Sequence, residues 1–193
     1  LGDVYKRQMQ VYGGNIRYAK PHFHVGLTAL SYSFGKFKMD PDPKPYNLFY
    51  FKGSNNFNMG VDYMLKTNRI TFYGEIALSK NGAVSTLNAL QLTPASYISF
   101  LVLYRYYDRR YQALFGNAFS QGSTVQNEQG VYMGFQLTPI ARWKLSVYAD
   151  LFRFPWLKYG IDAPSGGQEY MAQIDYTPSR NYSCLLYTSP SPR

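Results

Sequence analysis

The nine residues Trp143-Lys-Leu-Ser-Val-Tyr-Ala-Asp-Leu151 decide the fold. Every odd-numbered residue in this stretch is apolar, and every even-numbered residue carries a polar group. Successive side chains of a β-strand point to opposite faces, so strict alternation over this length indicates a strand with one apolar and one polar face.

The same alternation recurs at 57–65, 70–78 and 131–137. Most of the strands that we expect are 10 to 12 residues long, whereas strands of soluble proteins average about 5 to 6 residues. A tilted transmembrane strand needs about 9 to 11 residues, so strand length favours a membrane protein. Nine strands are expected, near 10–20, 23–36, 56–66, 70–80, 84–93, 97–107, 127–138, 143–154 and 168–177.

The connections between these strands fall into two groups. Short turns, several containing proline, are expected at 21–22, 67–69, 94–96, 139–142 and 178–180, and all of them lie at one edge of the sheet. Longer loops, 37–55, 108–126 and 155–167, lie at the other edge, together with the tight Asn81-Gly82 turn. Outer-membrane barrels have short periplasmic turns and longer extracellular loops. The pattern therefore predicts an all-β fold, an antiparallel up-and-down transmembrane β-barrel that is partial, with open edges.

Composition agrees with this prediction. The 193 residues include 18% aromatics and only 16% charged residues, which argues against disorder. No apolar run reaches the roughly 18 residues of a transmembrane helix. The 20 Lys and Arg against 11 Asp and Glu favour anionic partners.

Both ends of the chain resemble translated sequencing-adaptor sequence of metagenome-derived chains. We therefore expect residues 1–8 and 184–193 to be artefact and residues 9–183 to be the barrel segment. The one cysteine, Cys184, lies in the excluded end, so thiol chemistry is not expected in the rest.

The sequence contains few candidates for chemistry. His22 and His24 share a strand face but have no further metal ligand nearby in sequence, and the Asp40-Pro-Asp42-Pro stretch lacks the spacing of a calcium loop. No nucleophile elbow or phosphate loop occurs. We expect no enzyme activity, no metal and no cofactor. The charged residues on the polar faces are expected to face a lumen; they are Asp62, Glu75, Lys144 and Asp150.

Basic residues gather in the expected long loops. The abundant anion at an outer membrane is the phosphate of lipopolysaccharide, and the candidate contacts are Lys38, Lys44, Arg109, Arg110 and Lys158. The stretch 104–111 alternates bases with aromatics, as single-strand nucleic-acid platforms do. The same composition suits a strand that leaves a membrane into a loop, which we favour, so nucleic acid is not expected to bind this segment.

Three stretches add a family resemblance: Phe115-Gly-Asn-Ala-Phe-Ser-Gln-Gly-Ser123, Asn127-Glu-Gln-Gly130 and Asp150-Leu-Phe-Arg-Phe-Pro-Trp-Leu-Lys-Tyr-Gly160. They resemble the C-terminal barrel region of Gram-negative envelope proteins whose N-terminal part is a competence-type helix-hairpin-helix region. The resemblance implies an outer-membrane location, a scaffold or pore of unknown substrate, and a link to DNA uptake through a region outside this chain. The alternative is a soluble all-β sandwich or lectin-like binding module.

Overall fold

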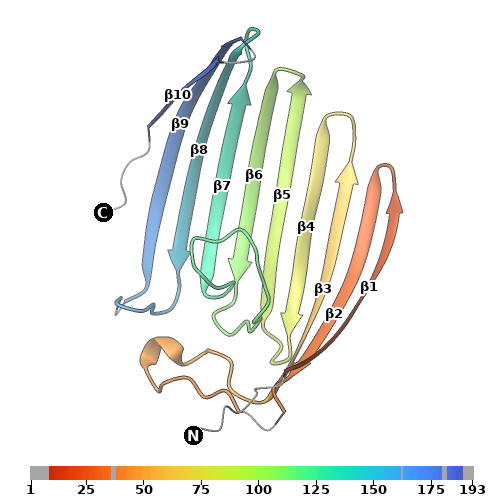
Figure 1. Ribbon diagram of the computed structural model, residues 1–193, viewed down its shortest axis with the longest axis vertical. Helices are drawn as coiled ribbons and strands as arrows, with labels where there is room; N and C mark the ends of the chain where they lie inside the picture. The colour runs from red at the N-terminus through yellow and green to blue at the C-terminus, as the bar shows by residue number, and fades with distance from the viewer. Residues whose placement is uncertain (1–8, 36–37, 162, 180–181, 189–193) are drawn as a thin grey trace, which may run out of the picture.

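The computed structural model describes residues 9–35, 38–161, 163–179 and 182–188. Ten strands form one antiparallel sheet in which each strand pairs only with its neighbours in sequence (Figure 1). The sheet is not closed, because β1 and β10 are not paired with each other. A single 3-10 turn, η1 (Pro45–Asn47), interrupts the first long loop. The strands are β1 (Gln10–Lys20), β2 (Phe23–Ser33), β3 (Asn55–Lys66), β4 (Ile70–Ser79), β5 (Val84–Ala95), β6 (Ile98–Tyr107), β7 (Glu128–Leu137), β8 (Trp143–Phe154), β9 (Ser165–Ser179) and β10 (Tyr182–Thr188).

All nine expected strands are present, and most of their ends agree within one or two residues. The tenth strand, β10, was not predicted, because the C-terminal end had been set aside as artefact. Its residues 184–188 pair with β9. The remaining residues of the two suspected artefact segments, 1–8 and 189–193, lie outside the described residues.

The up-and-down topology places the short turns at one end of the sheet and the long loops at the other (Figure 1). The tight turn at the long-loop end is closed by a hydrogen bond from Ser79 N–H to Ala83 O, with Gly82 at a φ of +77°. One turn prediction was wrong, since Pro94 lies inside β5 rather than after it. The pairing of β5 with β6 is irregular there, and such a bulge tolerates proline because no ladder N–H is needed.

The two faces of the sheet have different surroundings. The face on which the long loop 108–127 lies is called here the covered face, and the opposite one the apolar face. On the apolar face Ile70, Phe72 and Val147 are exposed, whereas Val131, Phe135 and Leu145 are half-buried. All described strands belong to one sheet, so the apolar side chains are not buried between two sheets as in a sandwich.

The small buried core lies between the loop and the covered face. It joins residues of β4 and β6 to the loops: Ala77, Ala83, Tyr107, Tyr111 and Val125. In Figure 1 the green loop crosses the lower ends of β6 and β7. The residues of this core are therefore buried because the loop 108–127 packs back onto the sheet.

Candidate functional site

A buried cluster of charges lies on the covered face, at the long-loop end of three neighbouring strands. Arg105 of β6 donates from Nε to Glu128 of β7 at 2.5 Å, and its two terminal nitrogens donate to both oxygens of Asp150 in β8 at 2.8 and 3.0 Å. The Arg105 and Glu128 side chains are fully buried, and that of Asp150 is 1% exposed. A bidentate contact, in which two guanidinium N–H groups bind both oxygens of one carboxylate, is among the strongest forms of an arginine–carboxylate ion pair.

The loop 108–127 supplies further donors to the carboxylates. The backbone N–H groups of Gln121 and Gly122 donate to Glu128 at 2.9 to 3.1 Å, and the Ser120 hydroxyl donates to it at 3.0 Å. The Gln121 side-chain amide donates to Asp150 at 2.9 Å and to Glu169 of β9 at 3.0 Å. The loop is thus bound to three strands of the sheet by charge-assisted hydrogen bonds.

Local sequence makes room for the guanidinium. Gly130 of β7 lies opposite Arg105, and a Cβ at that position would lie 2.7 Å from Arg105 Cζ. The ring of Phe119, from the loop, lies over the guanidinium at 5.1 Å, and the backbone oxygen of Phe119 accepts a hydrogen bond from Tyr107 at 2.7 Å. Buried charges cost free energy unless they are paired and hydrogen-bonded, and here sheet and loop together meet that requirement.

The four predicted lumen residues all lie on the covered face, because each pairs in register with residues of that face. Asp150 belongs to the buried cluster. Asp62 lies 3.2 Å from His24 Nε2 and directly opposite Glu75 on the next strand. Lys144 is exposed near the short-turn end, opposite Asp175.

The five predicted loop cations have different surroundings. Arg109 lies over the rings of Phe49 and Trp156, at 4.9 and 5.2 Å, and Lys158 Nζ lies 3.2 Å from the centre of the Phe154 ring. Burial lowers the pKa of Lys158, which Glu128 partly opposes.

The other three predicted cations, Arg110, Lys44 and Lys38, are exposed. Arg110 pairs with Asp108 at 3.2 Å; burial alone would raise the pKa of Asp108, but the hydrogen bonds from Arg110 outweigh it and lower that pKa. Lys44 lies 5.9 Å from the Tyr46 ring, and Lys38 is exposed. Only Arg109 and Lys158 are brought together, as walls of one cavity.

This cavity, which we call the rim cavity, has a volume of about 270 Å³ and lies between three long loops. Aromatic walls come from the first and third loops, where Phe49 packs edge-on against Trp156 at 5.2 Å and Tyr46 against Tyr159 at 5.6 Å. The Trp156 indole donates to Pro45 O at 3.1 Å, which fixes the wall.

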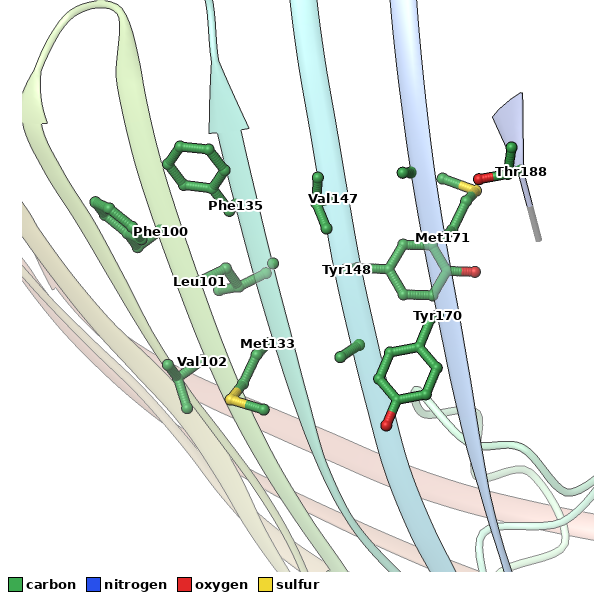
Figure 2. A pocket seen from close by; sticks show the side chains of 13 residues that line it. Phe100, Leu101, Val102, Met133, Phe135, Val147, Tyr148, Tyr170, Met171 and Thr188 are labelled. Carbon is green, nitrogen blue, oxygen red and sulfur yellow. The ribbon is translucent and has the colours of Figure 1, made fainter. Parts of the chain in front are cut away.

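A second hollow, of about 500 Å³, lies on the apolar face over β6 to β9 (Figure 2). Small side chains at Ala149 and Ala172 create it, and large ones such as Phe100, Phe135 and Tyr170 border it. A small-molecule site ordinarily has a few convergent polar groups to orient its ligand. This hollow is almost entirely apolar, which suits hydrocarbon chains better than a polar ligand.

Other candidate sites received no support. Among the described residues, no three His, Cys, Asp or Glu side chains gather as a metal site would require. In the stretch 104–111, Arg105 is fully buried and Tyr107 is 1% exposed, so these two side chains do not form an accessible surface for a ligand. No helix among the described residues is long and apolar enough to cross a membrane.

Sequence reasoning did not find three important residues, namely Arg105, Glu128 and Gln121. Arg105 was read only as part of an aromatic and basic stretch. Had the pairing of β6 with β7 and of β7 with β8 been worked out from the turns, Arg105, Glu128 and Asp150 would have fallen on one face at one end. Nothing in the sequence pattern indicated that Gln121 would reach them, since it lies in an irregular loop.

Comparison of the chain with protein-family profiles, with curated protein sequences and with solved structures gives no match.

Proposed function

We propose that this chain is a segment of a bacterial outer-membrane β-barrel, a non-catalytic scaffold or pore whose further strands would pair with the free edges of β1 and β10. The observation that carries the proposal is the apolar face. Each of the first nine strands places a large apolar side chain there that is at least 37% exposed: Ile16, Leu27, Val61, Ile76, Leu90, Val102, Met133, Val147 and Ile174.

The size of this surface is the reason for preferring lipid as its neighbour. Nine strands at about 4.8 Å spacing span on the order of 40 Å. Along β3 the apolar side chains run from Phe57 to Leu65, roughly 27 Å at about 3.3 Å per residue. That length is comparable with the roughly 25 Å apolar band of outer-membrane barrels, and soluble monomers rarely expose patches beyond about 600 Å².

The long loops would then lie on the extracellular side, next to lipopolysaccharide, and the covered face would line the lumen. In this arrangement the loop 108–127, which is hydrogen-bonded to the sheet, would narrow the lumen at its extracellular end. The family resemblance and its link to DNA uptake stay predictions, since they depend on a region outside this chain. The soluble-module alternative would need another partner to cover the apolar face, because the described strands contain no second sheet.

The test compares neighbouring positions on opposite faces. Val147→Trp and Ser146→Trp are each made with both natural tryptophans replaced by phenylalanine, and the purified protein is reconstituted into vesicles of phospholipid with brominated acyl chains. We expect strong quenching of the fluorescence at 147 and weak quenching at 146. We also expect almost no destabilisation by Val147→Trp, because lipid accepts a larger apolar side chain.

Two results would count against the proposal. The first is equal quenching at both positions. The second is a protein that is soluble without detergent and in which Val147→Trp costs about 1 to 3 kcal/mol, as overpacking of a closed core does.

A further inference from the structure

The rim cavity contains two cations that form no close ion pair with a described carboxylate, although Glu128 attracts Lys158 from farther away. Neither Arg109 nor Lys158 lies within 4.0 Å of an acidic side chain among the described residues, unlike Arg105 and Arg110. No described Asp or Glu lines the cavity. Arg109 is held instead on the faces of two aromatic rings, and Lys158 on one. Both charges are thus held in place while their hydrogen-bonding capacity stays available to an anion.

The remaining lining supplies hydroxyl and aromatic groups. Ser123 and Thr124 are exposed, and their hydroxyls make no side-chain hydrogen bond to another described residue. Tyr159, at 82% exposure, and Tyr46 add ring faces and phenol groups at the mouth. A hydroxyl-rich ligand with a flat apolar side matches such a lining, because it can form hydrogen bonds and also pack on aromatic rings.

The volume is sufficient for one sugar ring. About 270 Å³ is the volume of roughly nine liquid waters, at about 30 Å³ each. This accommodates one substituted sugar ring. A stacked nucleobase is less suitable, because Arg109 already lies over the rings of Phe49 and Trp156.

We propose that the rim cavity binds a single anionic sugar unit, a sugar bearing phosphate or carboxylate, with Arg109 and Lys158 holding the anion and the tyrosine, serine and threonine side chains contacting the ring. The proposal rests on the proposed function only for the side of the membrane that the cavity faces. The sugar has two possible sources with the same chemistry, the head group of a lipopolysaccharide and a free sugar phosphate.

The chain provides its own reporter for this binding. It has two tryptophans; Trp156 lines the cavity, while Trp143 lies at the opposite end of β8 against Tyr176, at 4.5 Å. Trp143→Phe therefore leaves one tryptophan, at the cavity. Its fluorescence is titrated in detergent micelles with glucose 6-phosphate, glucose, inorganic phosphate and AMP.

We expect saturable binding of glucose 6-phosphate that is at least about tenfold tighter than binding of the other three. Arg109→Gln and Lys158→Gln should each weaken it about tenfold or more, since each substitution removes a charge-assisted hydrogen bond to the anion. Arg110→Gln is the matched control, because Arg110 is the next residue in the chain but pairs with Asp108 and does not line the cavity; it should change affinity less than about twofold. An unchanged emission maximum before ligand is added shows that Lys158→Gln and Arg110→Gln keep the cavity wall; Arg109→Gln removes the cation over the indole, so its fold is checked by circular dichroism instead.

Several outcomes overturn the proposal: no response to glucose 6-phosphate, equal binding of glucose, tighter binding of AMP, or an equal loss in Arg110→Gln. Vesicles with and without lipopolysaccharide, the latter containing phosphatidylglycerol as the anion, then separate the two sources. Once glucose 6-phosphate binds, a Trp156 response to the lipopolysaccharide vesicles but not to the phosphatidylglycerol vesicles identifies the head group, and no response to either vesicle identifies a soluble ligand. The titration in micelles needs no bilayer, so its failure is distinct from failure of the brominated-lipid test.

Discussion

Replacing Arg105 by methionine tests whether the buried cluster holds the loop 108–127 on the sheet. The substitution removes the guanidinium and leaves Glu128 and Asp150 buried together. Removing one partner of a buried ion pair costs about 3 to 5 kcal/mol, because the remaining charge is left without compensation.

The structure indicates which carboxylate causes most of this loss. Glu128 keeps the donors from Ser120, Gln121 and Gly122, whereas Asp150 loses both of its guanidinium bonds and keeps only the Gln121 amide. Adding Asp150→Asn to Arg105→Met should therefore recover most of the lost stability. Adding Glu128→Gln should recover much less, since two backbone N–H groups are positioned to donate to a carboxylate.

The assay has two readings. Urea-driven unfolding in phospholipid vesicles gives the free energy of unfolding of each variant, and trypsin cleavage at Arg109 and Arg110 reports whether the loop is still docked. Arg105→Met should be cleaved faster than the parent, and the Asp150→Asn double variant should be cleaved at close to the parental rate. A loss below about 1 kcal/mol, or equal recovery by Glu128→Gln and Asp150→Asn, would refute the reasoning.

Two further predictions concern the same loop and sheet. Gly130→Ala should lower the free energy of unfolding in urea by about 1 to 3 kcal/mol, because its Cβ would lie 2.7 Å from Arg105 Cζ and 2.9 Å from a backbone oxygen. Gly134→Ala on the same face should cost less, because the nearest atom to its Cβ would be a tyrosine ring carbon at 3.2 Å. Equal losses in the two variants would contradict this prediction. Burial, assisted by the negative charge of Glu75, raises the pKa of Tyr111 to about 12, above the unfolded value of about 10. The contribution of Tyr111 to the free energy of unfolding is therefore fully present below about pH 10 and is lost as the pH rises toward 12. The pH dependence of unfolding should flatten over that window in Tyr111→Phe, and parallel profiles of variant and parent would disprove the assignment.

Much of the fold could be predicted because a strand's side-chain period is local. The alternation in residues 143–151 identifies β8 and its two faces without reference to any other strand, and the Asn81-Gly82 turn identifies the hairpin of β4 and β5. The turn at Pro94 was predicted wrongly because strand pairing is not local. Proline was expected to end the strand, but the irregular pairing of β5 with β6 admits it, and pairing depends on two strands.

The sequence by itself determined nine of the ten strands, most of the turns and loops between them, and which side chains share a face, since each of these depends on residues close together in the chain. Only the tertiary structure decided which charges meet. Arg105, Glu128 and Asp150 come together because the register of three strands aligns them and a loop folds back over them. Likewise Arg109 and Arg110 are adjacent and alike in sequence, yet one stacks on aromatic rings from two distant loops and the other pairs with Asp108. Long-range packing makes that difference, because the conformation of an irregular loop depends on what it contacts rather than on a repeating local pattern.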